Sequence, residues 1–174
     1  MKTKSTIKNQ NKPARHLVIF AGAGPGDPEL ITVKGQLALA DADLVIYAGS
    51  LVPEAVLKWT KPKHLEEIID EIEKAYKKGK HVVRLHTGDP SLYGAIFEQM
   101  ANLDKKSIPY KVIPGVTAAF AAAAAMGIEY TLPEVSQTLI LTRMAGRTPV
   151  PENEALESLA GHKASMAIYL SISM

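Results

Sequence analysis

Residues 17–32, which read LVIFAGAGPGDPELIT, constrain the fold of this chain more than any other stretch. The segment opens with a continuous apolar run at 17–20, as expected for a strand that is covered on both faces. Gly22, Gly24 and Gly26 follow, and glycine lets the backbone turn sharply and approach a ligand closely. The segment therefore predicts a buried strand, a tight loop and the start of a helix.

This glycine loop departs from the dinucleotide-binding fingerprint. Asp27 stands where the third glycine of that fingerprint belongs, and Pro25 and Pro28 remove two N–H donors from a loop that would otherwise cradle phosphate. We therefore expect a ligand without phosphate. A purely structural alternative stays open, in which Asp27 only caps the helix that follows.

Strand and helix patterns alternate through the first two thirds of the chain and predict an α/β fold with a parallel sheet. The predicted strands cover 16–20, 43–47, 81–86 and 110–113, and the predicted helices cover 30–40, 66–78 and 91–103. The Gly-Asp-Pro core recurs at residues 88–90, and 113–119 form a third strand-to-helix loop. Because ligands bind at the carboxyl ends of parallel strands, these loops predict one shared site.

A second α/β unit begins near Pro114. Its predicted helices cover 117–127 and 152–160, and its predicted strands cover 138–142 and 164–172. Two strands and two helices are too few to close a core of their own, so we expect this unit to be truncated. The chain is divided into a disordered basic leader (1–15), an N-terminal α/β domain (16–113) and a C-terminal α/β domain (114–174).

Charge and composition exclude several classes of function. Residues 1–16 carry five basic side chains and no acid, and subtracting these from the net charge of +2 leaves −3 for the rest. This mildly acidic body argues against a nucleic-acid partner. The absence of cysteine excludes disulfides and thiolate catalysis. We also expect no metal site, no membrane span and a cytoplasmic location, because ligand spacing and an apolar run of ~20 residues are both lacking.

The three loops, in this order and at this spacing, resemble those of the tetrapyrrole methylases, which transfer methyl groups from S-adenosylmethionine to corrin and sirohaem precursors. Segments 47–52, 94–100 and 142–152 resemble the members that methylate precorrins. The resemblance covers 17–174 and implies a cofactor cleft between two domains, a longer C-terminal domain and a homodimer. It also implies an additional short strand and loop after Lys63, so we expect a break in the chain before His64.

The resemblance also implies which residues form the site. The positions expected at the cofactor are Pro25, Thr87, Gly88, Asp89, Leu92, Thr117, Ala118 and Leu170, and those expected at the precorrin substrate are Gly24, Asp27, Arg143 and Arg147. Arginine suits a substrate rich in carboxylates, because its guanidinium binds them with two parallel hydrogen bonds. Arg84 and His86 are further candidates of this kind. Structural alternatives stay open for each: a turn at Asp89, a helix cap at Thr117, a half-buried His86 and solvated loop arginines.

Methyl transfer from a sulfonium to carbon is an in-line displacement, which requires alignment of the reactants more than a nucleophilic side chain. The sequence fits this chemistry, since it has no cysteine and no Ser-His-Asp pattern. Tyr47 and Tyr93 are weak candidates for handling a proton or stacking on the substrate. Two alternatives stay open: a methyltransferase for another acceptor (uroporphyrinogen, diphthine or ribosomal RNA), and a non-catalytic module that binds the cofactor.

Overall fold

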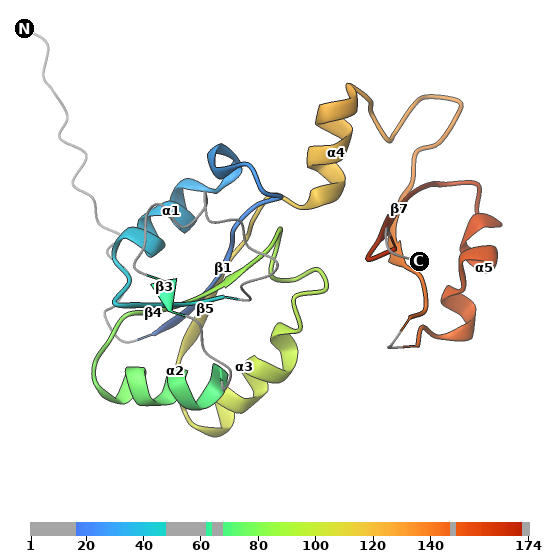
Figure 1. Ribbon diagram of the computed structural model, residues 1–174. Helices are drawn as coiled ribbons and strands as arrows, with labels where there is room; N and C mark the ends of the chain where they lie inside the picture. Colours follow the sequence, from blue (N-terminus) through green and yellow to red (C-terminus); the bar gives the residue numbers. More distant parts are fainter. Residues whose placement is uncertain (1–16, 48–61, 64–67, 147–148, 172–174) are drawn as a thin grey trace, which may run out of the picture. The chain divides into compact units, whose positions relative to one another are not determined.

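The computed structural model describes residues 17–47, 62–63, 68–146 and 149–171 (Figure 1). The chain divides into two compact units, Met1–Thr117 and Ala118–Met174. The predicted leader and the predicted break before His64 lie outside the described residues. Among the described residues, no helix has the length and apolar character that crossing a bilayer requires.

The first unit is built on a five-stranded parallel sheet with the strand order β3-β2-β4-β1-β5. Its strands are β1 (Val18–Gly22), β2 (Leu44–Ile46), β3 (Pro62–Lys63), β4 (Val82–His86) and β5 (Tyr110–Ile113). Every residue of β1, β2 and β4 is buried, as expected for strands of a parallel sheet that is covered on both faces. β1 lies between β4 and β5, where Ala21 pairs with Leu85 and Ile113. The loops that follow these three strands therefore leave the sheet side by side.

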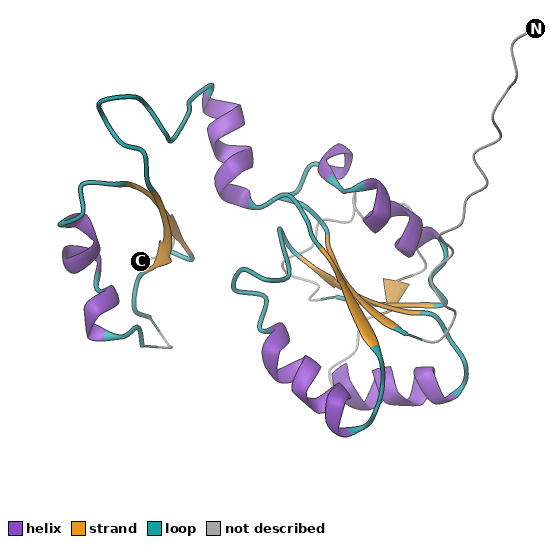
Figure 2. Ribbon diagram, turned by 180° about the vertical axis from the view of Figure 1, so that it is seen from behind, coloured by secondary structure: helices purple, strands orange, loops and turns teal. Residues whose placement is uncertain are grey.

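Helices cover both faces of this sheet (Figures 1 and 2). On one face lies α1 (Val33–Ala40), whose Leu39 joins a core with Ile19 and Val83. On the other face lie α2 (Ile68–Lys77) and α3 (Ile96–Lys105), whose Ile72 and Leu103 share a second core with Phe20. The predicted α/β class with a parallel sheet is confirmed.

Local sequence sets the ends of the helices. The Thr32 hydroxyl accepts a hydrogen bond from the N–H of Gly35 at 3.1 Å, which caps the start of α1. α2 ends just before Gly79, whose φ of 70° lies in the left-handed region that glycine adopts readily. Both ends follow from the residue types at these positions.

An ion-pair cluster joins the two helices on the second face. Glu73 of α2 accepts hydrogen bonds from Lys106, the residue that caps α3, and from Lys77 one turn further along α2, the latter at 2.6 Å. The Lys106 and Lys77 ammonium groups lower the pKa of Glu73 to about 2. The cluster adds a polar link to the apolar packing between α2 and α3.

Four elements differ from the sequence-based expectations. The helix predicted at 152–160 is split into a 3-10 turn, η3 (Glu152–Glu154), and α5 (Leu156–Ala160), with Ala155 in extended backbone between them. The helix predicted from residue 91 begins only at Ile96, because Tyr93 and Ala95 take positive φ values of 56° and 49° in a tight turn. The helix predicted at 30–40 is split into a 3-10 turn, η1 (Pro28–Leu30), and α1. β3 was not predicted, since a Pro-Lys pair carries no strand pattern; it pairs with β2.

The second unit has few elements and little core. It contains α4 (Ala118–Met126), β6 (Leu139–Arg143), the 3-10 turn η3 (Glu152–Glu154), α5 (Leu156–Ala160) and β7 (Ser165–Tyr169). β6 and β7 pair in parallel. Of its described residues, only Ala119, Ala123 and Thr142 are buried. This agrees with the expectation that two strands and two helices cannot close a core alone.

The core of the first unit gives a first testable prediction. Ile72 is fully buried under the sheet, so Ile72→Ala should lower the free energy of unfolding by about 2–5 kcal/mol. Val33 is 72% exposed on α1, and Val33→Ala should change it by less than about 0.5 kcal/mol. Urea denaturation followed by circular dichroism measures both. Equal effects of the two substitutions would contradict the described packing of α2.

Candidate active site

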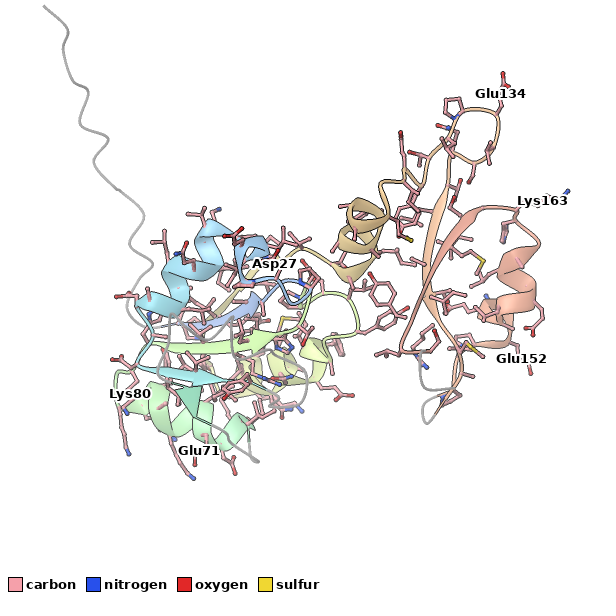
Figure 3. The ribbon with its side chains drawn as sticks, turned by 45° about the horizontal axis from the view of Figure 1, so that its top comes forward. Asp27, Glu71, Lys80, Glu134, Glu152 and Lys163 are labelled. Atoms are coloured by element: carbon pink, nitrogen blue, oxygen red, sulfur yellow. The ribbon has the colours of Figure 1, made fainter. Side chains whose placement is uncertain are left out.

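The loops after β1 and β4 are joined by main-chain hydrogen bonds beyond the end of the sheet. The N–H of Gly88 donates to the carbonyl of Gly24 at 2.7 Å, and the N–H of Gly24 donates to the carbonyl of Gly88 at 3.3 Å. The N–H of Ala23 donates to the carbonyl of His86 at 2.7 Å. In Figure 3, Asp27 marks this carboxyl edge of the sheet and Lys80, just before β4, marks the opposite edge.

Glycine is required where the three loops touch. A Cβ on Gly22 would lie 2.5 Å from the Cα of Gly115 and 2.5 Å from the carbonyl oxygen of Gly88. A Cβ on Gly115 would lie 2.1 Å from the same oxygen. We call the contact among Gly22, Gly88 and Gly115 the glycine junction. Gly22, interpreted from the sequence as leaving room for a ligand, instead leaves room for a neighbouring loop.

The two Gly-Asp-Pro loops use their aspartates in the same local way. Oδ1 of Asp27 accepts a hydrogen bond from the N–H of Glu29 at 2.8 Å, and Oδ1 of Asp89 accepts one from the N–H of Ser91 at 2.8 Å. Asp89 also reaches the third loop, because its Oδ2 accepts from the N–H of Gly115 at 2.9 Å. Asp27 therefore caps the turn that follows it and Asp89 forms a local turn, which are the structural alternatives that the sequence left open.

Most of the predicted site residues lie together at this edge. The loops after β1, β4 and β5 carry Gly24, Pro25, Asp27, Thr87, Gly88, Asp89, Leu92 and Thr117. Thr117 belongs to the group because its Cα lies 3.9 Å from the position that a Cβ on Gly88 would take. Gly88 has a φ of 63°, and nothing lies closer to that position. Gly88 is buried, and a Cβ there would be in ordinary van der Waals contact with Val116 and Thr117.

The predicted residues of the second unit are also brought near one another. The N–H of Ala119 donates to the hydroxyl of Tyr169 at 3.0 Å, which places the start of α4 beside the end of β7. Ala118 and Leu170 are the adjacent residues, and both are exposed. Leu170 has a φ of 57°, which is unusual for a large side chain, and is 68% exposed. Tyr169 was not predicted from the sequence, which carries no local signal for this contact.

Arg143 holds the loop that follows β6. Its guanidinium donates to the carbonyls of Met144 at 3.1 Å and Pro149 at 2.9 Å. Its predicted contact with the substrate stays a prediction, and Arg147 lies outside the described residues.

The two tyrosines singled out from the sequence differ in accessibility. Tyr93 is 43% exposed in the tight turn before α3, whereas Tyr47 is half-buried after β2. Their predicted roles in handling a proton or stacking on the substrate stay predictions.

Arg84 is part of the sheet rather than of an accessible substrate surface. It is buried, and its Nη1 donates to the carbonyls of Ile46 and Leu85, each at 3.2 Å. Its Nε donates to the amide oxygen of Gln99 at 3.3 Å. Burial lowers the pKa of this guanidinium. The sequence-based hypothesis of a carboxylate-binding Arg84 is therefore not supported by its surroundings.

His86 is buried beside Phe20, and its ring nitrogen Nε2 has no hydrogen-bond partner among the residues that the structure describes. Burial, with a smaller contribution from the charge of Arg84, lowers the pKa of His86 to about 4. The structure thus agrees better with the alternative of a structural, at least half-buried histidine than with a substrate contact. Among the described residues, no group of three His, Asp or Glu side chains is placed to hold a metal ion.

Comparison with models of known families identifies the family of this chain. The family model of the Tetrapyrrole (Corrin/Porphyrin) Methylases matches residues 17–174. This chain belongs to the tetrapyrrole methylase family. The resemblance inferred from the glycine loops is confirmed.

Two curated members of the family are close in sequence. The chain is 57% identical over 166 residues to a cobalt-precorrin-4 C(11)-methyltransferase of Methanocaldococcus jannaschii, covering 90% of this chain and 64% of the relative. It is 53% identical over 163 residues to a precorrin-4 C(11)-methyltransferase of Pseudomonas aeruginosa, covering 89% and 65%. The chain thus spans slightly less than two thirds of the length of these relatives.

Solved structures of family members agree with the fold. A cobalt precorrin-4 methyltransferase, described as a cobalamin biosynthetic enzyme, matches with a TM-score of 0.87 at 47% identity, over 92% of this chain and 71% of that chain. A uroporphyrin-III C-methyltransferase of Thermus thermophilus, in complex with S-adenosylhomocysteine, matches with a TM-score of 0.66 at 30% identity, over 79% and 60%. The second structure shows that a member of this family binds the product of S-adenosylmethionine.

The buried His86 predicts how the stability of this chain depends on pH. Its pKa is about 4 in the folded chain, against 6.5 for a histidine surrounded by water, so between these values only the unfolded chain takes up the proton. Stability should therefore fall as the pH falls from about 6.5 to 4, by about 3 kcal/mol at most. His86→Gln should flatten this slope in denaturation curves, whereas His162→Gln should not, because His162 is exposed. An unchanged slope in His86→Gln would contradict the prediction.

The glycine junction predicts a steric penalty. Gly22→Ala should lower the free energy of unfolding by about 1–3 kcal/mol, because the new Cβ would meet backbone atoms of two other loops. Gly161→Ala is the control, since it has helical geometry and its nearest neighbour, the carbonyl of Ser158, is 3.2 Å away. Thermal unfolding compares the two. If Gly22→Ala is as stable as the control, the loops are not in close contact.

Proposed function

We propose that this chain acts as an S-adenosylmethionine-dependent C-methyltransferase of cobalamin biosynthesis, which methylates precorrin-4 or cobalt-precorrin-4 at carbon 11. The observation that carries the proposal is the 57% identity to the cobalt-precorrin-4 C(11)-methyltransferase of M. jannaschii. Segments 47–52, 94–100 and 142–152 of the sequence favour the same reaction. By likeness to the family, the proposal also includes that the enzyme is cytoplasmic and forms a homodimer.

The geometry of the first unit fits a cofactor without phosphate. The loop after β4 presents the exposed Thr87 beside Gly88, and the loop after β5 brings the Cα of Thr117 to 3.9 Å from where a Cβ on Gly88 would lie. The loop after β1 contributes Pro25, a residue without an N–H donor, next to the bridge between Gly24 and Gly88. These residues carry no positive charge and Pro25 has no N–H to donate, which suits a nucleoside and an amino acid better than a phosphate.

When bound, the cofactor supplies a methyl group on a sulfonium; the carbon–sulfur electron pair stays on sulfur, and an electron pair of the macrocycle forms the new carbon–carbon bond. The residues of the chain then have to align the two reactants and exclude water, and alignment alone is worth ~7–11 kcal/mol of the barrier. We assign this alignment to the loops of the glycine junction. Tyr93, which is 43% exposed, stays a weak candidate for stacking on the macrocycle or handling a proton.

Binding of S-adenosylhomocysteine to the purified chain tests the cofactor. Calorimetric titration, with the intact mass recorded on the same sample, should give a dissociation constant in the micromolar range or below. Leu170→Ala should weaken binding about 10-fold, because a large apolar contact is lost. Ile168→Ala is the matched control, since Ile168 is also exposed on β7 but is not a predicted contact. No binding by the unmutated chain would contradict the proposal.

Methyl transfer distinguishes the remaining alternatives. Incubation with labelled S-adenosylmethionine and precorrin-4, with and without cobalt, should give a product one methyl group heavier and labelled at carbon 11. Labelling of uroporphyrinogen III instead would favour another member of the family. Cofactor binding without transfer to any of these acceptors would favour a non-catalytic module.

A further inference from the structure

Ala119, in the first turn of α4, is held by the hydroxyl groups of two tyrosines. Its N–H donates to the Tyr169 hydroxyl at 3.0 Å, and its carbonyl accepts a hydrogen bond from the Tyr130 hydroxyl at 2.8 Å. The first N–H groups of a helix have no partner inside the helix. Tyr169, 50 residues further along the chain, therefore supplies an acceptor that α4 cannot provide for itself.

These bonds fasten α4 to both ends of β7. Tyr169 is the last residue of that strand. Ser165 is the first, and its Oγ donates to the carbonyl of Tyr130 at 2.7 Å. Tyr130 also packs against Phe120 of α4 in an edge-to-face arrangement, with ring centroids 6.4 Å apart. The start of α4 and the end of β7 therefore have a fixed spacing.

The residue after Tyr169 has a backbone conformation that needs support. Leu170 has a φ of 57°, a left-handed value that persists in a residue with a large side chain only where the surrounding structure imposes it. Because its side chain is 68% exposed, packing of that side chain supplies little of the support. The bond between Ala119 and Tyr169 fixes the residue immediately before it. Strained residues of this kind cluster at binding and active sites.

We infer that Tyr169 is a positioning residue, whose hydroxyl holds Leu170 in its left-handed conformation beside Ala118, so that these two residues present one surface to the cofactor. The inference rests on the proposed function, since Ala118 and Leu170 are cofactor positions by family likeness. Removal of the hydroxyl takes this acceptor from the Ala119 N–H and releases the end of β7. Leu170 then relaxes to an ordinary extended conformation, which turns its side chain away from Ala118.

A cycle of single and double substitutions in the full chain tests the inference, with S-adenosylhomocysteine as the ligand. Tyr169→Phe keeps the ring and should weaken binding about 5-fold, as expected for the loss of one hydrogen bond. Leu170→Ala should weaken it about 10-fold. The double variant should also bind about 10-fold more weakly than the unmutated chain, because a displaced Leu170 has little contact left to lose. A loss of about 50-fold would mean that the two residues act independently and would overturn the inference.

Tyr110→Phe is the matched control. The Tyr110 hydroxyl also makes a hydrogen bond, to Asp104 at 3.2 Å, but this residue begins β5 and so lies at the end of the sheet opposite the site. Tyr110→Phe should bind the ligand as the unmutated chain does. In its background, Leu170→Ala should still cost about 10-fold. A reduced effect of Leu170→Ala in this control as well would show that the coupling is not specific to Tyr169, which contradicts the inference.

A second readout examines the backbone without any ligand. A residue with a positive φ gives a strong nuclear Overhauser effect between its own amide proton and Hα. Leu170 should show this signal in the unmutated chain and in Tyr110→Phe, and should lose it in Tyr169→Phe. An unchanged signal in Tyr169→Phe overturns the inference. Failure of the unmutated chain to bind S-adenosylhomocysteine contradicts the proposed function instead, while the Leu170 signal still decides whether Tyr169 holds this residue.

Discussion

The close approach of Gly22, Gly88 and Gly115 is the constraint on which the candidate site depends. Strands β4, β1 and β5 are neighbours in the sheet, so the loops that follow them must share one small region at its carboxyl edge. Side chains at Gly22 and Gly115 would separate the loops, whereas glycine lets main-chain atoms touch. Hydrogen bonds between Gly24 and Gly88, and between Asp89 and Gly115, close the contact. A site framed by main-chain atoms is rigid, as alignment of two reactants requires.

The sheet that supports this junction carries polar groups that a core usually excludes. Arg84 remains buried because its guanidinium donates to the carbonyl of Ile46, at the end of β2, and to Gln99 on α3. Gln99 in turn donates to the carbonyl of Ala95, in the turn with left-handed φ values. Buried polar groups are tolerated when they are hydrogen-bonded in this way. Because burial and the charge of Arg84 lower the pKa of His86, the imidazole is neutral at pH 7. Its protonation in acid destabilises β4, the strand that leads directly into the glycine junction.

The sequence was sufficient for the features that depend on neighbouring residues. A continuous apolar run located β1, and the apolar spacing that ends at Gly79 located α2. Contacts between distant residues could not be predicted, because no local pattern encodes them: the Asp89–Gly115 bond and the contact of Tyr169 with Ala119 appear only in the folded chain. β3 was missed for the same reason, since its two residues are a strand only through their pairing with β2.

The interlocked junction also limits where acceptor specificity can reside under the proposed function. Because Gly22, Gly88 and Gly115 fill one another's space, none of these loops can change shape without displacing the others. Such a frame suits the cofactor, which is common to a methyltransferase family, better than an acceptor that varies between members. The segment after β6 is different, since Arg143 organises it through carbonyls of its own loop. Exposed loops held by their own contacts change readily in evolution, so under the proposed function this segment is the better candidate for determining the acceptor.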